Sequence, residues 1–344
     1  MESHIHKTNL AMTLGSILFW AATLSINGQN AEKTAASATA SATVQVMNFP
    51  KQTFTYKTVG DCVIQADVYR APGDEVRPVI LWIHGGALIS GDRGGINRGQ
   101  LEKYLKAGYT LVSIDYRLAP ETKLKNIIED LQDAHRWLRA KGPGLFRIDP
   151  NRMAVIGHSA GGYLTLMAGF CLEPRPRALV SFYGYGDIAG DWYSRPDPFY
   201  SKQPAVPKAE AYQAVGGPVL TEGTNRNRFR FYLYCRQQGL WPKEIAGYDP
   251  DAEPRKFDPF CPVRNVTKDY PPTLLLHGDQ DTDVPYQQSV VMAEELKHHG
   301  VEHKLITMTN RGHGFDGGRK AMEDPVVVET FDQVLAFLNQ HVRR

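Results

Sequence analysis

A serine at position 159 lies between small residues, in a pattern that places a nucleophile on a sharp turn. The segment Gly157-His158-Ser159-Ala160-Gly161 follows the apolar run 153–156, and apolar residues at helical spacing come after it. A serine between a strand and a helix has a strained backbone, so only small residues two positions away avoid a collision. The first amides of the helix and the positive end of its dipole then point at the serine. The sequence therefore predicts Ser159 as the nucleophile of an acyl transfer.

Two glycines upstream could supply the hydrogen-bond donors that this chemistry needs. Gly85 and Gly86 follow His84 and the apolar run 79–83. Glycines let backbone N–H groups approach a substrate closely, and together with the amide of Ala160 they could stabilise a developing oxyanion. A simple tight turn would explain either glycine alone, but not the pair combined with the serine turn. His84 is expected to brace this loop rather than act as a base.

One histidine and several aspartates near the C-terminus could complete the site. His313 lies between two glycines in a loop after the last apolar run, where a general base can be placed freely. Asp279, Asp281 and Asp283 follow the apolar run 272–276. Carboxylates crowded at a strand end more often bind turn amides or face solvent than serve one imidazole. Local chemistry therefore leaves the choice among the three aspartates open.

Short β-rich runs alternate with longer amphipathic stretches from residue 63 onward. This alternation is typical of βαβ units, whose strands form a parallel sheet. The sequence therefore predicts the α/β class, with a mostly parallel central sheet and helices on both faces. Strands are expected at 63–69, 78–83, 110–114, 153–156, 179–183, 273–276 and 304–307, and helices at 97–106, 125–138, 163–170, 287–298 and 327–342.

Residues 184–270 interrupt this alternation and predict an insertion. Proline, glycine and aromatic residues crowd there, and no clean strand pattern is present. The insertion follows a strand, and loops that leave the carboxyl ends of parallel strands build the binding crevice. Trp192 and Tyr193 are therefore expected to line the acyl or alcohol pocket as part of a lid. The alternative is that the aromatic residues form only a satellite core.

Composition excludes several classes of function. The chain has 344 residues, 42% of them hydrophobic, which is enough for a sizeable core. A formal charge of +2 from 39 basic and 37 acidic residues creates no broad electrostatic field that would attract nucleic acid or an anionic membrane. The 4 cysteines form no C-x-x-C pair, although Cys235 and Cys261 could form a disulfide in an oxidising compartment. No metal and no organic cofactor is implied.

The N-terminal residues have the pattern of a targeting signal. Lys7 precedes an apolar stretch at 10–24, which is short for a membrane span of roughly 20 apolar residues. We expect residues 1–28 to be a signal peptide, so that the protein is exported to the periplasm or secreted and is not stably inserted in a membrane. A retained anchor is the alternative. The Ala/Ser/Thr-rich residues 29–46 predict a linker, and 47–344 the catalytic domain.

Taken together, the motifs resemble those of the hormone-sensitive-lipase-like branch of the α/β-hydrolase superfamily, which includes many bacterial acetyl esterases. The resemblance runs from residue 63 to the C-terminus, although 122–130 lacks the family's F-P-A and 184–270 is longer than in compact members. The matching segments are H-G-G at 84–86, D-Y-R-L-A-P-E at 115–121, G-x-S-A-G-G at 157–162, H-G-x-x-D-x-x-V-P at 277–285 and G-H-G-F at 312–315.

This resemblance implies which aspartate belongs to the site. The fixed carboxylate of the family motif falls on Asp281, and the chain order Ser, Asp, His is that of the superfamily. The implied function is a serine esterase, in which His313 takes the proton of Ser159 and the serine attacks an ester carbonyl. The implied substrate is a small-molecule or carbohydrate ester, with a short-chain or carbohydrate-linked acyl group. The number of subunits is not predicted.

Two other functions remain open from the sequence. Oligopeptidases and arylformamidases resemble the same core, so an amide or peptide hydrolase is an alternative. A non-catalytic binding module is a second alternative, because a fold does not fix a function. The complete set of Ser159, Asp281 and His313, together with the glycine pair, argues against the binding module.

Overall fold

The structure, a computed structural model, describes residues 49–223, 226–318 and 320–343. The predicted signal peptide and linker, residues 1–28 and 29–46, lie outside the described residues. In the described part, no helix combines the length and the apolar character that a membrane span requires.

An eight-stranded sheet forms the centre of the molecule, with the strand order β1-β2-β4-β3-β5-β6-β7-β8. The six strands β3 to β8 run parallel to one another. Strands β1 and β2 pair antiparallel with each other, and β2 pairs antiparallel with β4. This arrangement confirms the predicted fold class. The bounds are β1 (Lys51–Val59), β2 (Cys62–Tyr69), β3 (Arg77–Ile83), β4 (Thr110–Ile114), β5 (Ile148–His158), β6 (Ala178–Phe182), β7 (Thr273–Gly278) and β8 (His303–Met308).

Strand β1 is absent from the sequence prediction, which began its strands at residue 63. The strand lies at the edge of the sheet, and most of its side chains are exposed or half-buried. It therefore lacks the continuous apolar run that marks a strand buried on both faces. Its aromatic residues Phe54 and Tyr56 pack against Trp137. The sequence does contain one sign of a hairpin here, the glycine at position 60. Gly60 lies in the two-residue turn between β1 and β2 and has a φ of +57°.

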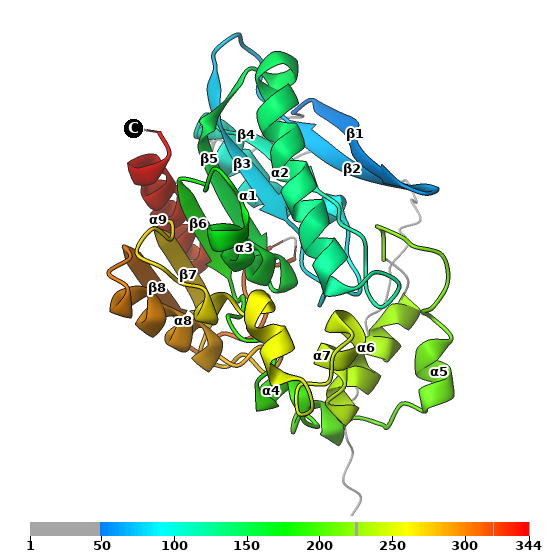
Figure 1. The fold of residues 1–344 in the computed structure, drawn as a ribbon. Coiled ribbons are helices and arrows are strands. Elements are labelled where there is room, and N and C mark those ends of the chain that lie inside the picture. Colours follow the sequence, from blue (N-terminus) through cyan, green and yellow to red (C-terminus); the bar gives the residue numbers. More distant parts are fainter. Residues whose placement is uncertain (1–48, 224–225, 319, 344) are drawn as a thin grey trace, which may run out of the picture. The chain divides into compact units, whose positions relative to one another are not determined.

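Two hydrophobic cores lie on opposite faces of the sheet, because neighbouring residues of each central strand point to opposite sides. Ile80 and Trp82 of β3 pack with α1 and α9, whereas Val79 and Leu81 pack with α2, α3 and α8. Figure 1 shows these two helical layers around the sheet. The helices are α1 (Arg98–Lys106), α2 (Leu124–Phe146), α3 (Ala160–Cys171), α8 (Gln287–His298) and α9 (Pro325–His341).

Residues 184–270 leave β6 and return to β7 as a series of short helices. Their described part contains no strand of the sheet, and Figure 1 shows α4 to α7 gathered at one end of the sheet. The segment contains α4 (Asp191–Ser194), α5 (Lys208–Tyr212), α6 (Arg226–Gln238) and α7 (Trp241–Ala246), with 3₁₀ turns at Tyr200–Lys202, Pro254–Phe260 and Pro262–Arg264.

All four cysteines lie within the described residues, and each is a free thiol. Cys235 and Cys261 are both buried and are not joined to each other, so the disulfide considered from the sequence is not formed. Burial raises the pKa of the Cys261 thiol to about 12, which keeps the thiol protonated near neutral pH.

Candidate active site

Ser159 lies on the turn between β5 and α3, in the strained conformation that the sequence predicts. Its φ is 55° and its ψ is −118°, and its amide donates a hydrogen bond to the carbonyl of Phe182 at 2.9 Å. The flanking glycines are required by close packing. A Cβ on Gly157 would collide with the carbonyl of Gly161, and a Cβ on Gly161 would collide with the carbonyl of Ile83. The turn therefore holds the serine side chain in a fixed position.

The structure brings Ser159, His313 and Asp281 together from three separate segments. His313 Nε2 lies 3.0 Å from Ser159 Oγ, and His313 Nδ1 lies 2.7 Å from Asp281 Oδ2. Ser159 follows β5, Asp281 follows β7 and His313 follows β8. Because Nδ1 faces a carboxylate, it carries the proton, and Nε2 is free to accept the proton of the serine. This geometry matches a nucleophile, a base and an orienting acid.

Asp281 is the carboxylate that faces His313, and its other contacts fix its orientation. Oδ1 accepts hydrogen bonds from the amides of Asp283 and Val284, at 2.8 and 2.9 Å, and Oδ2 also lies 3.1 Å from His277 Nε2. Burial acts to raise the pKa of Asp281, but the hydrogen bonds from His277 and His313 hold it well below its ordinary value. The carboxylate therefore stays ionised beside the imidazole.

The other two aspartates have different partners. Asp279 Oδ1 accepts the amide of Asn310 at 2.7 Å, so Asp279 braces the turn that precedes His313. Asp283 contacts Tyr200, Tyr232 and Arg236. The structure thus resolves the choice that local chemistry left open, and it places Asp281 where the family resemblance expects it.

The imidazole of His313 is held by packing and by charge. Tyr183 meets the ring edge to face, with the ring centroids 4.6 Å apart, and its hydroxyl donates to Asp316 at 2.7 Å. Burial lowers the pKa of His313, but the hydrogen bond to Asp281 and the charges of Asp283, Asp281 and Asp316 raise it above its ordinary value. These groups would stabilise a charged imidazole, such as the one formed if His313 took the proton of Ser159.

The glycine loop after β3 has an unusual backbone that exposes N–H groups beside Ser159. Gly86, Ala87 and Leu88 all have positive φ, at 107°, 56° and 62°. In the described part of the chain, the N–H groups of Gly85 and Gly86 donate to no acceptor. Ala160 is the first residue of α3, so its N–H has no intrahelical acceptor either. All three predicted oxyanion donors therefore border the nucleophile.

Contacts from helices α6 and α7 hold this loop in place. Trp241 Nε1 donates to the carbonyl of Ala87 at 3.1 Å, and Arg228 Nε donates to the carbonyl of Ile89 at 2.7 Å. Arg228 also forms a buried ion pair with Glu121 at 2.8 Å, which joins it to the D-Y-R-L-A-P-E segment. The helical segment is therefore part of the scaffold of the site.

His84 has the bracing contacts expected from the sequence. Its Nδ1 lies 2.7 Å from the carbonyl of Gly85, and its ring stacks on Tyr116 with the centroids 4.2 Å apart. Burial lowers its pKa to about 4, so the ring is neutral near pH 7 and adds no charge to the site.

Comparisons with known proteins agree with this architecture. Residues 66–176 match the BD-FAE family model, and residues 231–344 match the model of the prolyl oligopeptidase family. An α/β hydrolase superfamily protein from Enterococcus faecalis is 21% identical, with a TM-score of 0.64 over 85% of this chain and 100% of that one. Carboxyl esterase 2 from Tuber melanosporum is 22% identical, with a TM-score of 0.62 over 86% of this chain and 88% of that one. These likenesses show that the chain has the α/β-hydrolase fold.

Curated proteins that are similar to this chain include much longer enzymes. Non-reducing polyketide synthase adrD from Penicillium rubens is 27% identical over 87% of this chain, and 5-methylorsellinic acid synthase from Aspergillus terreus is 29% identical over 77% of it. The match covers only 14% and 12% of those two proteins. The likeness therefore concerns one part of each synthase. The closer assignment to the hormone-sensitive-lipase-like branch stays a prediction.

A cavity of about 310 Å³ opens at Ser159. It is lined by Ser159, His313 and both glycines of the oxyanion loop, so a bound substrate would meet the predicted nucleophile, the predicted base and two of the predicted oxyanion donors there. We assign this cavity as the substrate pocket. Its lining consists of Gly85, Gly86, Ala87, Ser90, His158, Ser159, Tyr183, Phe229, Tyr232, Asp283, His313 and Gly314.

The expected roles of Trp192 and Tyr193 need correction, because neither residue lines this pocket. Tyr193 is only 1% exposed and is stacked between Trp192 and Trp241, with ring centroids 3.8 and 4.0 Å apart. Tyr193 belongs to the hydrophobic core that also contains Val79 and Leu81 of β3, and Trp192 packs against it. The pair therefore has the core role of the alternative prediction, but in the main core and not in a satellite. Aromatic residues from 184–270 do line the pocket, but they are Phe229 and Tyr232. These two lie three residues apart on α6, a helix that the sequence did not predict.

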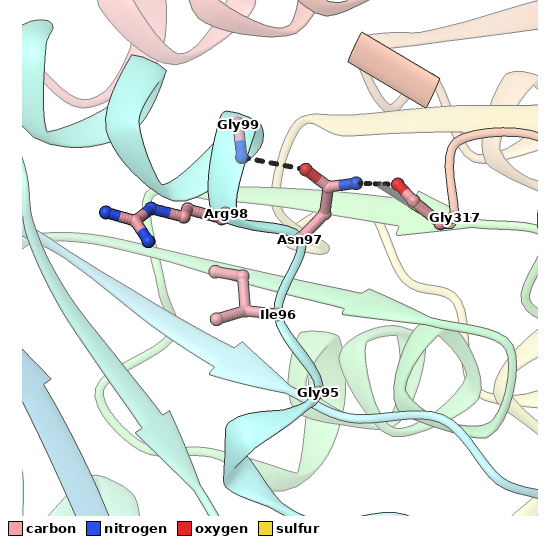
Figure 2. Close-up of a pocket in the computed structure, with 7 residues that line it drawn as sticks. Gly95, Ile96, Asn97, Arg98, Gly99 and Gly317 are labelled. Atoms are coloured by element: carbon pink, nitrogen blue, oxygen red, sulfur yellow. Dashed lines mark hydrogen bonds between the residues drawn. The ribbon is translucent and has the colours of Figure 1, made fainter. Parts of the chain in front are cut away.

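A larger hollow of about 630 Å³ lies elsewhere, between the start of α1 and the loop after His313. None of the predicted catalytic residues lines it. Figure 2 shows Asn97 at its wall, where Oδ1 accepts the amide of Gly99 at 2.8 Å and Nδ2 donates to the carbonyl of Gly318 at 2.8 Å. Gln100 also donates to Asp316 at 2.6 Å. These contacts tie α1 to the loop that carries His313, so we assign a supporting role to this region.

The Gly85→Ala variant is expected to lose about 10²-fold or more in kcat, the scale of one oxyanion donor. A Cβ at this position would lie 2.8 Å from the carbonyl oxygen of His158 and 3.2 Å from Cβ of Ser159, so the loop and the nucleophile must move apart. Steady-state kinetics on an acetate ester would measure the loss.

Gly144→Ala is the matched control for this variant. It lies within α2, and an added Cβ meets nothing within 4 Å. Alanine is favoured over glycine in a helix by up to about 1 kcal/mol, so this variant should keep its activity and unfold at a slightly higher temperature. Wild-type kcat in Gly85→Ala would contradict the assignment of the oxyanion loop.

Proposed function

We propose that this hydrolase cleaves carboxylic esters through an acyl-enzyme formed on Ser159. The observation that carries the proposal is the hydrogen-bonded series Ser159 Oγ, His313 Nε2 and Nδ1, and Asp281 Oδ2, which opens into the same cavity as Gly85 and Gly86. A serine within hydrogen-bond distance of an oriented histidine, with two glycine amides at the same cavity, supports a proposal of acyl transfer.

In the proposed mechanism, Ser159 Oγ attacks the ester carbonyl while His313 Nε2 takes its proton. Negative charge then develops on the carbonyl oxygen, where the N–H groups of Gly85, Gly86 and Ala160 stabilise it. His313 gives the proton to the oxygen of the leaving alcohol as the carbon–oxygen bond breaks, and the acyl group stays on Ser159. A water molecule, deprotonated by the same nitrogen, attacks the acyl carbon. The bond from this carbon to Ser159 Oγ breaks, His313 returns the proton to Oγ, and the acid leaves.

The size of the cavity supports a short acyl group. Its volume of about 310 Å³ lies at the lower end of the range of about 300–1,000 Å³ for small-molecule sites. Phe229 at its edge is 53% exposed, so the pocket opens to solvent on that side and leaves room for a larger alcohol. These features favour short-chain esters, including those of carbohydrates. The signal-peptide pattern of residues 1–28 supports an exported enzyme acting on such substrates.

An amide or peptide hydrolase is the second candidate. The match of residues 231–344 to the prolyl oligopeptidase family model favours it, and the same three residues could cleave an amide. This candidate differs from the esterase in the leaving group that His313 must protonate, an amine in place of an alcohol.

A panel of substrates separates these functions. It should contain p-nitrophenyl acetate, butyrate and decanoate, an acetylated and a feruloylated sugar, and an aminoacyl p-nitroanilide. We expect hydrolysis of the acetate and the butyrate, with kcat/KM at least about tenfold lower for the decanoate because the pocket is small. A higher kcat/KM for the anilide than for every ester would establish the amide hydrolase instead.

A further inference from the structure

Asp283 places a second carboxylate beside the reaction centre. Its Oδ2 lies 3.5 Å from His313 Nε2, the nitrogen that faces Ser159, and the residue lines the substrate pocket with 21% of its side chain exposed. Asp281 already orients His313, so Asp283 has no part in that relay. Among the described residues, no group donates a hydrogen bond to this Oδ2. One carboxylate oxygen is thus left for a ligand in the pocket.

The other oxygen of Asp283 is fixed by a network from the segment 184–270. Oδ1 accepts hydrogen bonds from the hydroxyls of Tyr200 and Tyr232 and from Arg236 Nη1, the first and last at 2.9 Å. Arg236 is only 1% exposed and also donates to the backbone carbonyl of Asp283 at 2.8 Å. These contacts hold the carboxylate in one orientation, with Oδ2 toward the pocket. The sequence offered no sign of this network, because each of the three donors lies at least 47 positions from Asp283 in the chain.

During ester cleavage, the leaving oxygen must come within hydrogen-bond distance of His313 Nε2 to receive the proton. An atom 3.5 Å from that nitrogen therefore lies next to the leaving alcohol. A bound substrate displaces water from Oδ2 of Asp283, and this costs free energy unless the substrate supplies a hydrogen-bond donor in its place. A substrate with a donor at this position therefore binds more favourably. A hydroxyl on the carbon next to the ester-bearing carbon occupies this position.

We propose that Asp283 selects esters of vicinal diols, such as partly acylated sugars and polyols, by accepting a hydrogen bond from the hydroxyl beside the ester. This proposal rests on the proposed esterase function and specifies its alcohol. Arg236 favours a neutral donor over a cationic one, because its guanidinium already lies 2.9 Å from the same carboxylate. The small acyl side of the pocket and its open edge at Phe229 agree with a compact acyl group on a larger polyhydroxylated alcohol.

A matched pair of substrates tests this proposal directly. Cyclohexyl acetate and cis-2-hydroxycyclohexyl acetate differ only in the neighbouring hydroxyl. We expect the wild-type enzyme to hydrolyse the hydroxylated ester with a kcat/KM at least about tenfold higher, which corresponds to one hydrogen bond worth about 1.4 kcal/mol. The ratio of the two values is the readout, so it does not depend on the fraction of active protein.

The Asp283→Asn variant removes the acceptor while keeping the shape of the side chain. Arg236 and the two tyrosine hydroxyls hold an oxygen at the Oδ1 position, so the amide nitrogen should replace Oδ2 and present a donor in place of an acceptor. The ratio should fall at least about tenfold in this variant. The control is Asp279→Asn, which removes a charge from the same loop at a carboxylate bound to the amide of Asn310, and which should keep the wild-type ratio.

The outcomes separate this proposal from the esterase function. Hydrolysis of both acetates at equal rates by the wild-type enzyme would overturn the role of Asp283 and leave the esterase intact. An unchanged ratio in a folded Asp283→Asn variant would overturn it as well. Hydrolysis of neither acetate by a folded wild-type protein would reject the esterase, and this proposal with it. The wild-type ratio alone supports or overturns the role of Asp283 even if the variant fails to fold.

Discussion

Ser159→Ala is expected to reduce kcat by roughly 10⁶-fold while the protein remains folded. In the proposed mechanism, the hydroxyl oxygen of Ser159 forms the bond to the acyl group, and His313 Nε2, 3.0 Å away, takes the hydroxyl proton. Alanine has no oxygen that could do this. Alanine keeps the Cβ and the backbone contact from the amide of residue 159 to the carbonyl of Phe182. Turnover of an acetate ester by the purified variant, together with its thermal unfolding, would measure both expectations.

Ser201→Ala is the control for the loss of a single hydroxyl. Ser201 is exposed and lies in a 3₁₀ turn outside the pocket, so its variant should have wild-type turnover. If Ser159→Ala kept more than a few per cent of wild-type turnover, the nucleophile would have to be another residue. The residual activity expected after loss of the serine comes from the oxyanion donors and from substrate binding.

Asp281→Asn should have the second largest effect, a loss of about 10⁴-fold in kcat. Oδ1 of Asp281 accepts two backbone amides, so asparagine must keep its oxygen there and turn its amide group toward His313 Nδ1. The imidazole then faces a donor and must carry its proton on Nε2. In this tautomer Nε2 cannot accept the proton of Ser159. Steady-state kinetics on the same acetate ester would measure the loss.

The neighbouring aspartates provide the comparison for this variant. Asp279→Asn removes a carboxylate that only braces the amide of Asn310, so it should leave kcat within a few-fold of wild type. Asp283→Asn removes a charge that raises the pKa of His313, so its loss should be measurable but far smaller than that of Asp281→Asn. Collapse of activity in Asp283→Asn combined with an active Asp281→Asn would reverse the assignment of the two carboxylates.

The central strands were predictable from sequence because they are buried on both faces. The fully buried run in β3 contains only apolar residues, and β4 is also fully buried although it includes Thr110 and Ser113. A continuous apolar run such as that of β3 is typical of a strand covered on both faces. Helix α6 was not predictable in the same way. Its buried face includes Arg228 and Arg236, whose charges are matched by Glu121, Asp197 and Asp283 on other elements. Buried charges remove the apolar periodicity that reveals a helix.

In the site, too, some features depend on residues that are close in sequence and others on contacts between distant segments. The turn at Ser159 and the glycine loop depend on neighbours in sequence, and the structure places these segments beside His313 as the motifs suggest. The pocket wall depends on contacts between distant segments. Tyr232 and Asp283 meet across 51 positions, and no local pattern marks such a pair. For the same reason, aromatic content alone could not distinguish Tyr232 from Tyr193.

Covalent trapping of the nucleophile tests the central claim most directly. A fluorophosphonate reacts with a serine that an adjacent base activates, and it leaves a stable phosphonyl group on that oxygen. Intact-protein mass spectrometry should show one adduct on the wild-type protein, located to Ser159 by peptide mapping, and no adduct on Ser159→Ala. An unmodified folded wild-type protein, or an equally modified Ser159→Ala variant, would contradict the claim that Ser159 is the activated nucleophile of this hydrolase.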